Sequence, residues 1–423
     1  MPEEGAELSG LLDLLFDRAI PKSFHTAGPG YLAYVPGGGL PVAAIADLIS
    51  GIVNRYTGVF AAAPALARLE ANVLAWFCQE AGYPKTARGL LLSGGSLANF
   101  SALVVARHDR LPENFLHGVI YASTETHHSI PKAARMAGFP ARNLRSIPVD
   151  HEHRMRLDLL ADAIEEDRRQ GLTPFLVVGN AGTVNTGAID PFPALADLAH
   201  REGLWLHVDG AYGACFLWTE EGKTKLSGVE RADSITLDPH KGFFLPYGTG
   251  ALLVRDGAAL ERAFSVGADY LPQMQSDPEF VDWSQSSPEL SRPYRGLRLW
   301  LPFKLYGVRA FRDALTEKLA LARRATEGLR AIPEIEVVAE PQLSIVAFRL
   351  HPEGLEDVAL DELNRRFLAA VNARQRIHLS GTRLEGRFVL RICVLSFRTH
   401  ADRIDAGLED LRAAAAQVLS TRI

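Results

Sequence analysis

Apolar residues between positions 89 and 254 come in short runs, separated for the most part by segments of helical pattern. The runs are apolar along their whole length, which is typical of strands buried on both faces of a parallel sheet. Their alternation with helical segments predicts an α/β fold, a mostly parallel sheet with helices on both faces. The expected strands are Gly89–Leu92, Gly118–Tyr121, Leu144–Val149, Phe175–Val178, Leu204–Val208, Ser234–Leu237 and Gly250–Val254.

Helical periodicity flanks this region on both sides. A short helical lead is expected at Leu11–Phe16, and a helix with one apolar face begins at Pro64. Further on, the pattern predicts a helix over 295–331 that bends near Pro302. A smaller C-terminal α/β domain would follow, with strands at Glu336–Ala339, Ile345–Leu350 and Phe388–Leu395, a helix from Leu360 and a final helix.

These changes of pattern predict three regions: an N-terminal segment, 1–60, a large domain, 61–294, and a connecting helix with a small domain, 295–423. The large domain would end in a polar stretch, 267–294, that shows little periodicity. A structureless segment of this length is either a functional lid or a disordered linker. Near the N-terminus, Gly37–Gly39 permit close approach of the backbone to a ligand, although a mobile surface loop fits the composition equally well.

Composition narrows the class of protein. A net charge of -5 over 423 residues argues against nucleic-acid binding as the main function. Three widely separated cysteines indicate neither a disulfide framework nor a metal site. The N-terminus lacks the basic region of a signal peptide, and no apolar run reaches the roughly 20 residues that a membrane span needs. We therefore expect a soluble cytoplasmic protein.

Small and polar residues follow several expected strands, at the edge where ligands bind in parallel α/β sheets. Ser93-Gly94-Gly95-Ser96 joins the first strand to a helix. Backbone N–H groups at a helix N-terminus favour an anion, so this turn predicts a phosphate site to which Ser96 adds a hydroxyl. An ordinary serine cap after a glycine-rich turn is the alternative.

Two more strand ends carry candidate groups. The imidazole of His127 fits the cover of a planar ring as well as it fits a capping residue; adjacent histidines such as His127 and His128 make a poor chelating pair. Asp209 ends an apolar strand, where a buried carboxylate needs a partner. A protonated ring nitrogen would serve, and capping of the next helix is the alternative.

Lys241 follows Asp238-Pro239-His240 and precedes Gly242-Phe243-Phe244. A strand and two aromatic rings leave the lysine little access to water, so we expect a lowered pKa and a neutral amine that forms an imine with an aldehyde. A surface lysine at a strand end is the alternative. Together, the four features are the parts needed to hold pyridoxal 5'-phosphate: an anion cradle, a ring cover, a partner for the pyridine nitrogen and an aldehyde trap.

The motifs His207–Tyr212, Asp238–Lys241, Arg295–Trp300 and Phe388–Ile392 carry a resemblance to a known family. In their order and spacing the chain resembles the group II pyridoxal-phosphate decarboxylases of fold-type I, and the aromatic-L-amino-acid decarboxylases in particular. The resemblance extends from about residue 28 over nearly the whole chain. It implies the fold-type I architecture, pyridoxal 5'-phosphate as cofactor, an amino acid substrate, and a homodimer with its active site at the subunit interface.

The resemblance also implies roles for single residues. Lys241 would bind the cofactor aldehyde, Asp209 would pair with the pyridine nitrogen, and His127 would stack on the ring. Arg391, in an apolar strand, would lie near the substrate, and an ordinary salt bridge is its alternative. Further residues are expected beside the cofactor (Gly95, Ser96, Thr183, Asn185, Ala211, Asp238 and His240) and in the substrate pocket (Tyr34, Tyr56 and Phe60).

The chain also departs from the family pattern. Most of the N-terminal extension of longer members is missing, Val184 stands where relatives often have threonine, and Asp238 stands where aromatic decarboxylases have asparagine. In the expected lid, Trp283 aligns with a tyrosine associated with protonation of Cα; a shift of the alignment would bring Tyr270 or Tyr294 there instead. An indole N–H is only a hydrogen-bond donor and cannot act as a general acid near neutral pH.

Three functions follow from these observations. The first is decarboxylation of an L-amino acid to an amine and carbon dioxide, with His127 or a water as the acid. The second is another outcome of the same chemistry, either decarboxylation with oxidative deamination to an aldehyde or a different carbon–carbon lyase reaction. The third is a cofactor-binding protein without turnover. Tyr31, Tyr34, Tyr56 and Phe60 mildly favour an aromatic substrate.

Overall fold

All seven apolar runs form strands of one sheet. The structure, a computed structural model, describes residues 2–266 and 282–420. In these residues the sheet has the order β1-β7-β6-β5-β4-β2-β3, and it is parallel except at β7, which runs antiparallel to both neighbours. The strands are β1 (Arg88–Leu92), β2 (Gly118–Ser123), β3 (Leu144–Ile147), β4 (Thr173–Asn180), β5 (Trp205–Asp209), β6 (Ser234–Leu237) and β7 (Gly250–Val254).

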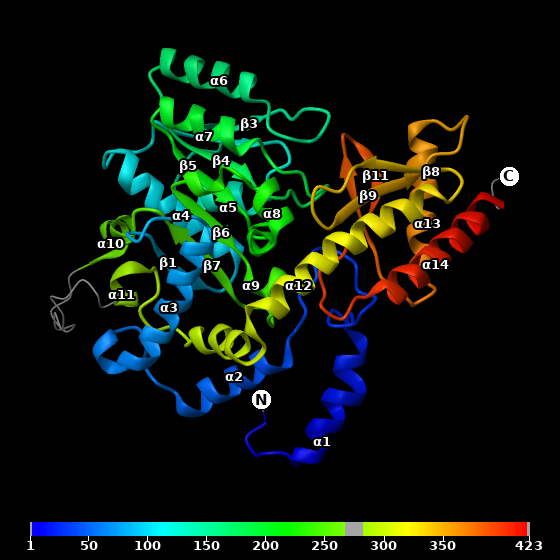
Figure 1. Cartoon of the computed structure of the whole chain (residues 1–423), viewed down its shortest axis with the longest axis horizontal. Coiled ribbons are helices and arrows are strands. Elements are labelled where there is room, and N and C mark those ends of the chain that lie inside the picture. Colours follow the sequence, from blue (N-terminus) through cyan, green and yellow to red (C-terminus); the bar gives the residue numbers. More distant parts are fainter. Residues whose placement is uncertain (1, 267–281, 421–423) are drawn as a thin grey trace.

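Helices cover both faces of this sheet (Figure 1). Asn99 of α4 contacts His207 of β5 on one face, whereas a side chain at Gly179 of β4 would meet Phe192 and Leu195 of α7 on the other. The helices of this part are α3 (Pro64–Glu80), α4 (Gly95–Arg110), α5 (Ser129–Met136), α6 (Leu157–Arg169), α7 (Phe192–Arg201), α8 (Glu220–Lys225), α9 (Pro239–Gly242), α10 (Ala258–Phe264) and α11 (Trp283–Ser286). The expected α/β fold is confirmed.

A second, smaller body with its own apolar core follows the long helix α12 (Gly296–Arg330), which runs between the two bodies in Figure 1. Its described residues form an antiparallel sheet of order β10-β11-β9-β8. Its elements are β8 (Ile335–Ala339), β9 (Ile345–Leu350), α13 (Asp357–Asn372), β10 (Ser380–Leu384), β11 (Arg387–Cys393) and α14 (Ala401–Ser420). The division of the chain at residues 60 and 294 stays a prediction.

The bend expected near Pro302 lies elsewhere. Pro302 keeps helical geometry, and the backbone leaves the helix at Gly307, with φ 74° and ψ 154°. Positive φ is open to glycine at little cost, because glycine has no Cβ. The proline falls in the second turn of α12 and the glycine five residues later, so the glycine sets the change of direction.

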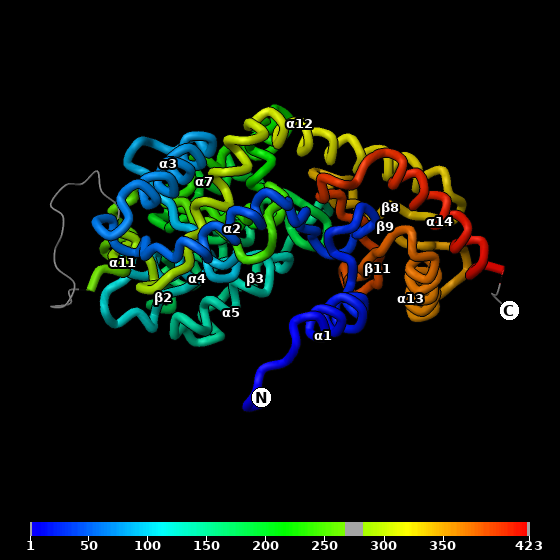
Figure 2. Tube along the Cα trace, turned by 90° about the horizontal axis from the view of Figure 1, so that it is seen from below, coloured from blue at the N-terminus to red at the C-terminus, as the bar shows by residue number. Residues whose placement is uncertain are grey.

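The N-terminal helices are poorly covered. Figure 2 shows α1 (Leu8–Asp13) projecting from the rest of the chain, and no residue of α1 is buried in the described structure. Helix α2 (Pro41–Val53) contacts α12 but exposes Leu48 and Ile52, which are 62% and 74% accessible. The part of the chain described here has no helix with the length and hydrophobicity of a membrane span. The remaining helical segments are the π-helix η1 (Leu14–Ala19) and the 3₁₀-helices η2 (Ile20–Lys22), η3 (Phe60–Ala62), η4 (Ala141–Asn143), η5 (Ala214–Trp218) and η6 (Val229–Arg231).

Candidate active site

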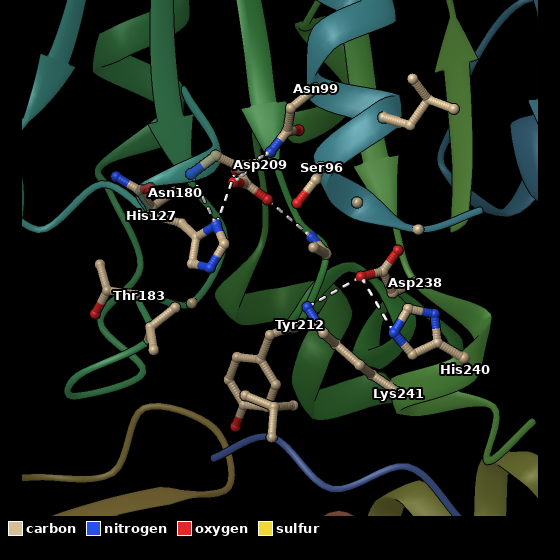
Figure 3. A pocket seen from close by; sticks show the side chains of 18 of the residues that line it. Ser96, Asn99, His127, Asn180, Thr183, Asp209, Tyr212, Asp238, His240 and Lys241 are labelled. Atoms are coloured by element: carbon tan, nitrogen blue, oxygen red, sulfur yellow. Dashed lines mark hydrogen bonds and ion pairs between the residues drawn. The ribbon is translucent and has the colours of Figure 1, made fainter. Parts of the chain in front are cut away.

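A cavity of about 290 Å³ opens at the carboxyl ends of β4, β5 and β6. This is close to the lower end of the range, roughly 300–1,000 Å³, of sites that hold small molecules. The ends of the parallel strands bring together side chains from distant parts of the chain, as Figure 3 shows. The residues that line the cavity include nine of the predicted cofactor residues: Gly95, Ser96, His127, Thr183, Asp209, Ala211, Asp238, His240 and Lys241.

The first turn of α4 forms one wall of the cavity. Its N-cap is Gly94, and the first N–H groups of a helix have no partner within the helix. A Cβ at Gly95 would lie 2.9 Å from both Ala211 Cβ and Asp238 Oδ2, so only glycine keeps this wall open. A 16-residue helix that points its N-terminus into a cavity is suited to bind a phosphate.

Asp209 lies at the end of β5 and is 7% accessible. Its Oδ2 accepts a hydrogen bond from Asn99 Nδ2 at 2.8 Å, and its Oδ1 accepts one from the backbone N–H of Ala211 at 3.2 Å. A carboxylate has about four acceptor positions, so two further donors fit. The carboxylate is therefore available for the N–H of a protonated ring.

Lys241 lies on the short helix α9, where its Nζ is 3.0 Å from Asp238 Oδ2. Burial lowers the pKa of the Lys241 ammonium, but the charges of Asp238 and Asp209 and the hydrogen bond to Asp238 outweigh burial and hold the pKa above its ordinary value. The expected lowering of this pKa is therefore wrong. The lysine of the cofactor-free chain is an ion-paired ammonium.

Asp238 does not turn away from the cavity. It is 2% accessible, and in the described structure its Oδ1 makes no hydrogen bond. His240 donates from Nδ1 to the carbonyl oxygen of Thr249 at 2.6 Å, and its Nε2 lies 3.7 Å from Asp238 Oδ2. Since burial lowers the pKa of His240, the ring is neutral at neutral pH and the charge of Asp238 is balanced chiefly by Lys241.

The backbone of the glycine segment packs against the helix that carries Lys241. A Cβ at Gly37 would lie 2.5 Å from the carbonyl oxygen of His240, and one at Gly38 would lie 2.6 Å from Phe244 Cβ. Gly37 thus permits a close approach to backbone, and Gly38 permits a close approach to side chains. Val35, two residues before Gly37, lines the cavity.

Six candidate residues lie outside the cavity of the single chain. Asn185 donates to Glu125 and accepts from Thr382. Tyr34 and Tyr56 are 60% and 40% accessible. Phe60 donates its backbone N–H to Asp282 at 2.6 Å. The remaining two are Arg391 and Trp283.

Arg391 is 3% accessible and contacts no carboxylate among the described residues, so the alternative of an ordinary salt bridge is wrong. It donates to the carbonyl oxygens of Asn185 and Tyr34 and, at 3.4 Å, to Ser380. Burial lowers the pKa of this guanidinium. Its contacts connect β11 to the turn 182–187 and to the N-terminal segment, and it reaches the cavity only through them.

Trp283 does not face the cavity either. It begins α11, is 3% accessible and packs in the large core under the guanidinium of Arg292, whose Cζ is 5.3 Å from the ring centre. Tyr294 donates to the carbonyl oxygen of Leu66 and also lies away from the cavity. The expected lid overlaps residues 267–281, which with Tyr270 lie outside the described residues. The structure does not support Trp283 as a catalytic group.

The cavity also includes residues that the sequence did not single out: Asn99, Ser129, Asn180 and Tyr212. Asn99 contacts the Asp209 carboxylate, and Ser129 contacts His127 Nδ1 at 2.8 Å. A sequence signal existed for His207, which contacts Asn99 but does not line the cavity. His207 precedes Asp209 by two residues, and such residues share one face of a strand.

The residues of the cavity fit pyridoxal 5'-phosphate. Gly95 and the N-terminus of α4 suit the phosphate. The Asp209 carboxylate accepts two hydrogen bonds within the chain and has room for a third, from a protonated pyridine. Lys241, on α9, lines the same cavity. The chain therefore has a group suited to each part of the cofactor: Lys241 for the aldehyde, Asp209 for the ring nitrogen and the N-terminus of α4 for the phosphate.

Comparison with known proteins gives a consistent result. The conserved domain of pyridoxal-dependent decarboxylases matches residues 12–351. An aromatic-L-amino-acid decarboxylase from Bacillus atrophaeus is 35% identical over 420 residues, which cover 99% of this chain and 88% of the relative. The structure of Oryza sativa TDC with PLP and tryptamine matches with a TM-score of 0.94 at 28% identity, over 99% of this chain and 89% of that one. The structure of Rhodiola rosea 4-hydroxyphenylacetaldehyde synthase matches with a TM-score of 0.91 at 26% identity, over 99% and 89%.

Proposed function

The chain belongs to the family of pyridoxal-dependent decarboxylases, and we propose that it converts an aromatic L-amino acid to its amine and carbon dioxide. The observation that supports this proposal most is the single cavity in which Lys241, Asp209 and His127 face the N-terminus of α4. The similarity to an aromatic-L-amino-acid decarboxylase supports the choice of an aromatic substrate.

Pyridoxal 5'-phosphate supplies an aldehyde that binds amines and a protonated ring that accepts the electrons left on Cα when carbon dioxide departs. Lys241 would provide the amine that holds the aldehyde. Asp209 would accept the hydrogen of the ring nitrogen and so keep that proton in place, while the first turn of α4 and Ser96 would hold the phosphate. His127 would cover the ring with a neutral imidazole that adds no competing charge, because burial lowers its pKa.

Residues outside the cavity of one chain have supporting roles in the proposal. Arg391 fixes the carbonyl groups of Tyr34 and Asn185 and thereby the two segments that border the cavity. We assign Tyr34, Tyr56 and Phe60 to a substrate pocket completed by a second copy of the chain. The exposure of both tyrosines in the single chain supports this assignment.

The product decides between this function and its alternative. Holoenzyme is incubated with each L-amino acid separately, and products are identified by mass spectrometry while dissolved oxygen is recorded. We expect one amine for each substrate consumed, from an aromatic amino acid, without oxygen uptake. An aldehyde with ammonia and consumed oxygen would instead establish decarboxylation with oxidative deamination; a protein of similar fold is named an aldehyde synthase. If no amino acid is turned over, the third function remains, a protein that binds the cofactor without catalysis.

Asp238→Asn is expected to shift the pH dependence of cofactor attachment. Only the neutral amine of Lys241 reacts with an aldehyde, so attachment becomes faster as the pH rises toward the lysine pKa. Asp238 raises that pKa, and Lys241 also interacts electrostatically with Asp209, Cys215, His127, His240 and Cys393. Removal of the Asp238 charge lowers the lysine pKa, and the curve of rate against pH moves to lower pH.

The measurement is the rate at which cofactor-free protein takes up pyridoxal 5'-phosphate, with borohydride trapping at each pH. Asp167→Asn is the matched control, because Asp167 is also 2% accessible and ion-paired, to Arg145, but lies away from the cavity. A curve for Asp238→Asn that coincides with that of the unchanged protein would show that Asp238 does not control the lysine.

We further propose that the chain acts as a homodimer in the cytoplasm. The apolar residues that α1 and α2 expose support a dimer, since large exposed apolar patches mark interaction surfaces. Introducing Leu48→Lys and Ile52→Lys together should convert the dimer to a monomer in sedimentation velocity experiments, without change in far-ultraviolet circular dichroism. Val358→Lys is the control, at an 84% accessible position of α13. A double variant that remains dimeric would locate the interface elsewhere.

A further inference from the structure

We propose that Asn99 is a positioning residue that sets the hydrogen bonds of both Asp209 and His127 through one buried network that begins at Trp205. The proposal rests on the proposed function insofar as the cavity holds pyridoxal 5'-phosphate. The network itself belongs to the chain alone. Its members are Trp205, Ser234, His207, Asn99, Asp209, Ser129 and His127.

Asn99 occupies the second turn of α4 and is 1% accessible. Its Nδ2 lies 2.8 Å from Asp209 Oδ2 and 2.9 Å from Ser129 Oγ. An ionised carboxylate accepts hydrogen bonds and donates none, so the amide nitrogen must face Asp209. This fixes the orientation of the amide and turns Oδ1 toward His207, whose Nε2 is 3.0 Å away.

His207 holds the amide in this orientation. Its Nε2 faces an acceptor and therefore carries a hydrogen. Burial lowers the pKa of His207 to about 4, so the ring is neutral and Nδ1 carries no hydrogen. Nδ1 thus accepts from the hydroxyl of Ser234 at 2.8 Å, and that hydroxyl accepts from Trp205 Nε1, also at 2.8 Å. An indole nitrogen only donates, so every hydrogen bond on this side of Asn99 has one consistent direction.

The second branch leads to His127. Since Ser129 Oγ accepts a hydrogen from Asn99, its own hydrogen is free to point at His127 Nδ1, 2.8 Å away. The backbone N–H of Ser129 also donates to Nδ1, at 3.2 Å. Two donors at Nδ1 leave the ring hydrogen on Nε2. His127 lines the cavity, and in Figure 3 its other ring nitrogen, Nε2, carries no interaction line.

One amide therefore prepares two groups of the site. Asp209 offers acceptor oxygens to the cavity, and His127 offers one N–H donor. Without Asn99, neither the ionised form of Asp209 nor the Nε2–H tautomer of His127 would be fixed. A buried carboxylate changes its protonation and a buried imidazole its tautomer when their hydrogen-bond partners change. The side chain of Asn99, on α4, connects the two groups: it contacts Asp209 directly and His127 through Ser129.

The test is Asn99→Asp, which replaces the donor with an acceptor. The new carboxylate draws the Ser129 hydroxyl hydrogen away from His127, so the ring hydrogen should move from Nε2 to Nδ1. It also repels Asp209, so binding of pyridoxal 5'-phosphate should weaken roughly tenfold or more. The tautomer is read from nitrogen-15 spectra of histidine-labelled, cofactor-free protein, with the His127 signals among the 13 histidines identified by His127→Gln.

Asn143→Leu is the matched control. Asn143 is 3% accessible and also makes two Nδ2 hydrogen bonds, to the carbonyl oxygens of Leu116 and Gly118, away from the cavity. It should lose stability but keep the His127 tautomer and the cofactor affinity. If Asn99→Asp does not fold, Asn99→Leu is measured in the same way, and a mixture of both tautomers is expected.

The proposal is overturned if the unchanged protein carries the His127 hydrogen on Nδ1. It is overturned equally if the Asn99 variants keep both the tautomer and the cofactor affinity of the unchanged protein. If the unchanged protein binds no pyridoxal 5'-phosphate, the proposed function fails, and the spectra of the cofactor-free protein still decide the role of Asn99.

Discussion

Lys241→Ala abolishes covalent attachment of pyridoxal 5'-phosphate and lowers kcat for decarboxylation by roughly 1,000-fold or more. Without this amine, the cofactor is held only by contacts to its phosphate and ring, and its aldehyde is no longer oriented toward the incoming amino acid. The ion pair with Asp238 is lost as well, which leaves a buried carboxylate without its cation. Cofactor affinity should therefore fall together with the rate.

The rate is measured by carbon dioxide release, and attachment by the cofactor absorbance that remains after dialysis. Lys223→Ala is the control, because Lys223 is exposed on α8 and lies outside the cavity. An unchanged absorbance band in the Lys241 variant after dialysis would mean that another residue binds the aldehyde.

Asp209→Asn is expected to have the second largest effect, a fall in kcat of roughly 10- to 100-fold. The amide has nearly the shape of the carboxylate but lacks its charge, so the ring nitrogen loses the acceptor that keeps it protonated. A ring without this proton withdraws electrons from Cα less strongly. Asn99 Nδ2 and the backbone N–H of Ala211 both donate to Asp209. In the variant they face an amide, which has one acceptor oxygen in place of two.

Steady-state kinetics and the pH dependence of the cofactor spectrum check this prediction. A loss of fold would lower kcat without a specific spectral change, so Asp167→Asn serves again as the matched buried carboxylate. Equal kcat values and equal spectra for Asp209→Asn and the unchanged protein would exclude a role for Asp209 at the ring.

The large sheet could be predicted because its strands are buried on both faces and are therefore apolar throughout. The strand β10 was missed for the opposite reason. Its residues, Ser-Gly-Thr-Arg-Leu, are mostly polar and lie at the edge of the small sheet, where pairing with β11 determines the structure. The break at Gly307 was missed because a proline is a stronger local signal than a single glycine in a helical pattern.

The candidate cofactor residues could largely be predicted because each follows a strand of a parallel sheet, so their positions along the chain imply one edge. The protonation of Lys241 could not be judged from burial alone. Asp238 precedes it by three residues on one helical turn, a spacing that brings opposite charges together. Asn99 was missed because its importance arises from contacts with β5 and α5, which no local pattern contains.

Reduction of the holoenzyme with borohydride, followed by peptide mass spectrometry, identifies the residue that binds the cofactor aldehyde. The cofactor becomes fixed to the residue that bound its aldehyde, and the modified peptide identifies that residue. We expect one phosphopyridoxyl group per chain, on Lys241. A label on another lysine, or a chain without any label after incubation with pyridoxal 5'-phosphate, would contradict it.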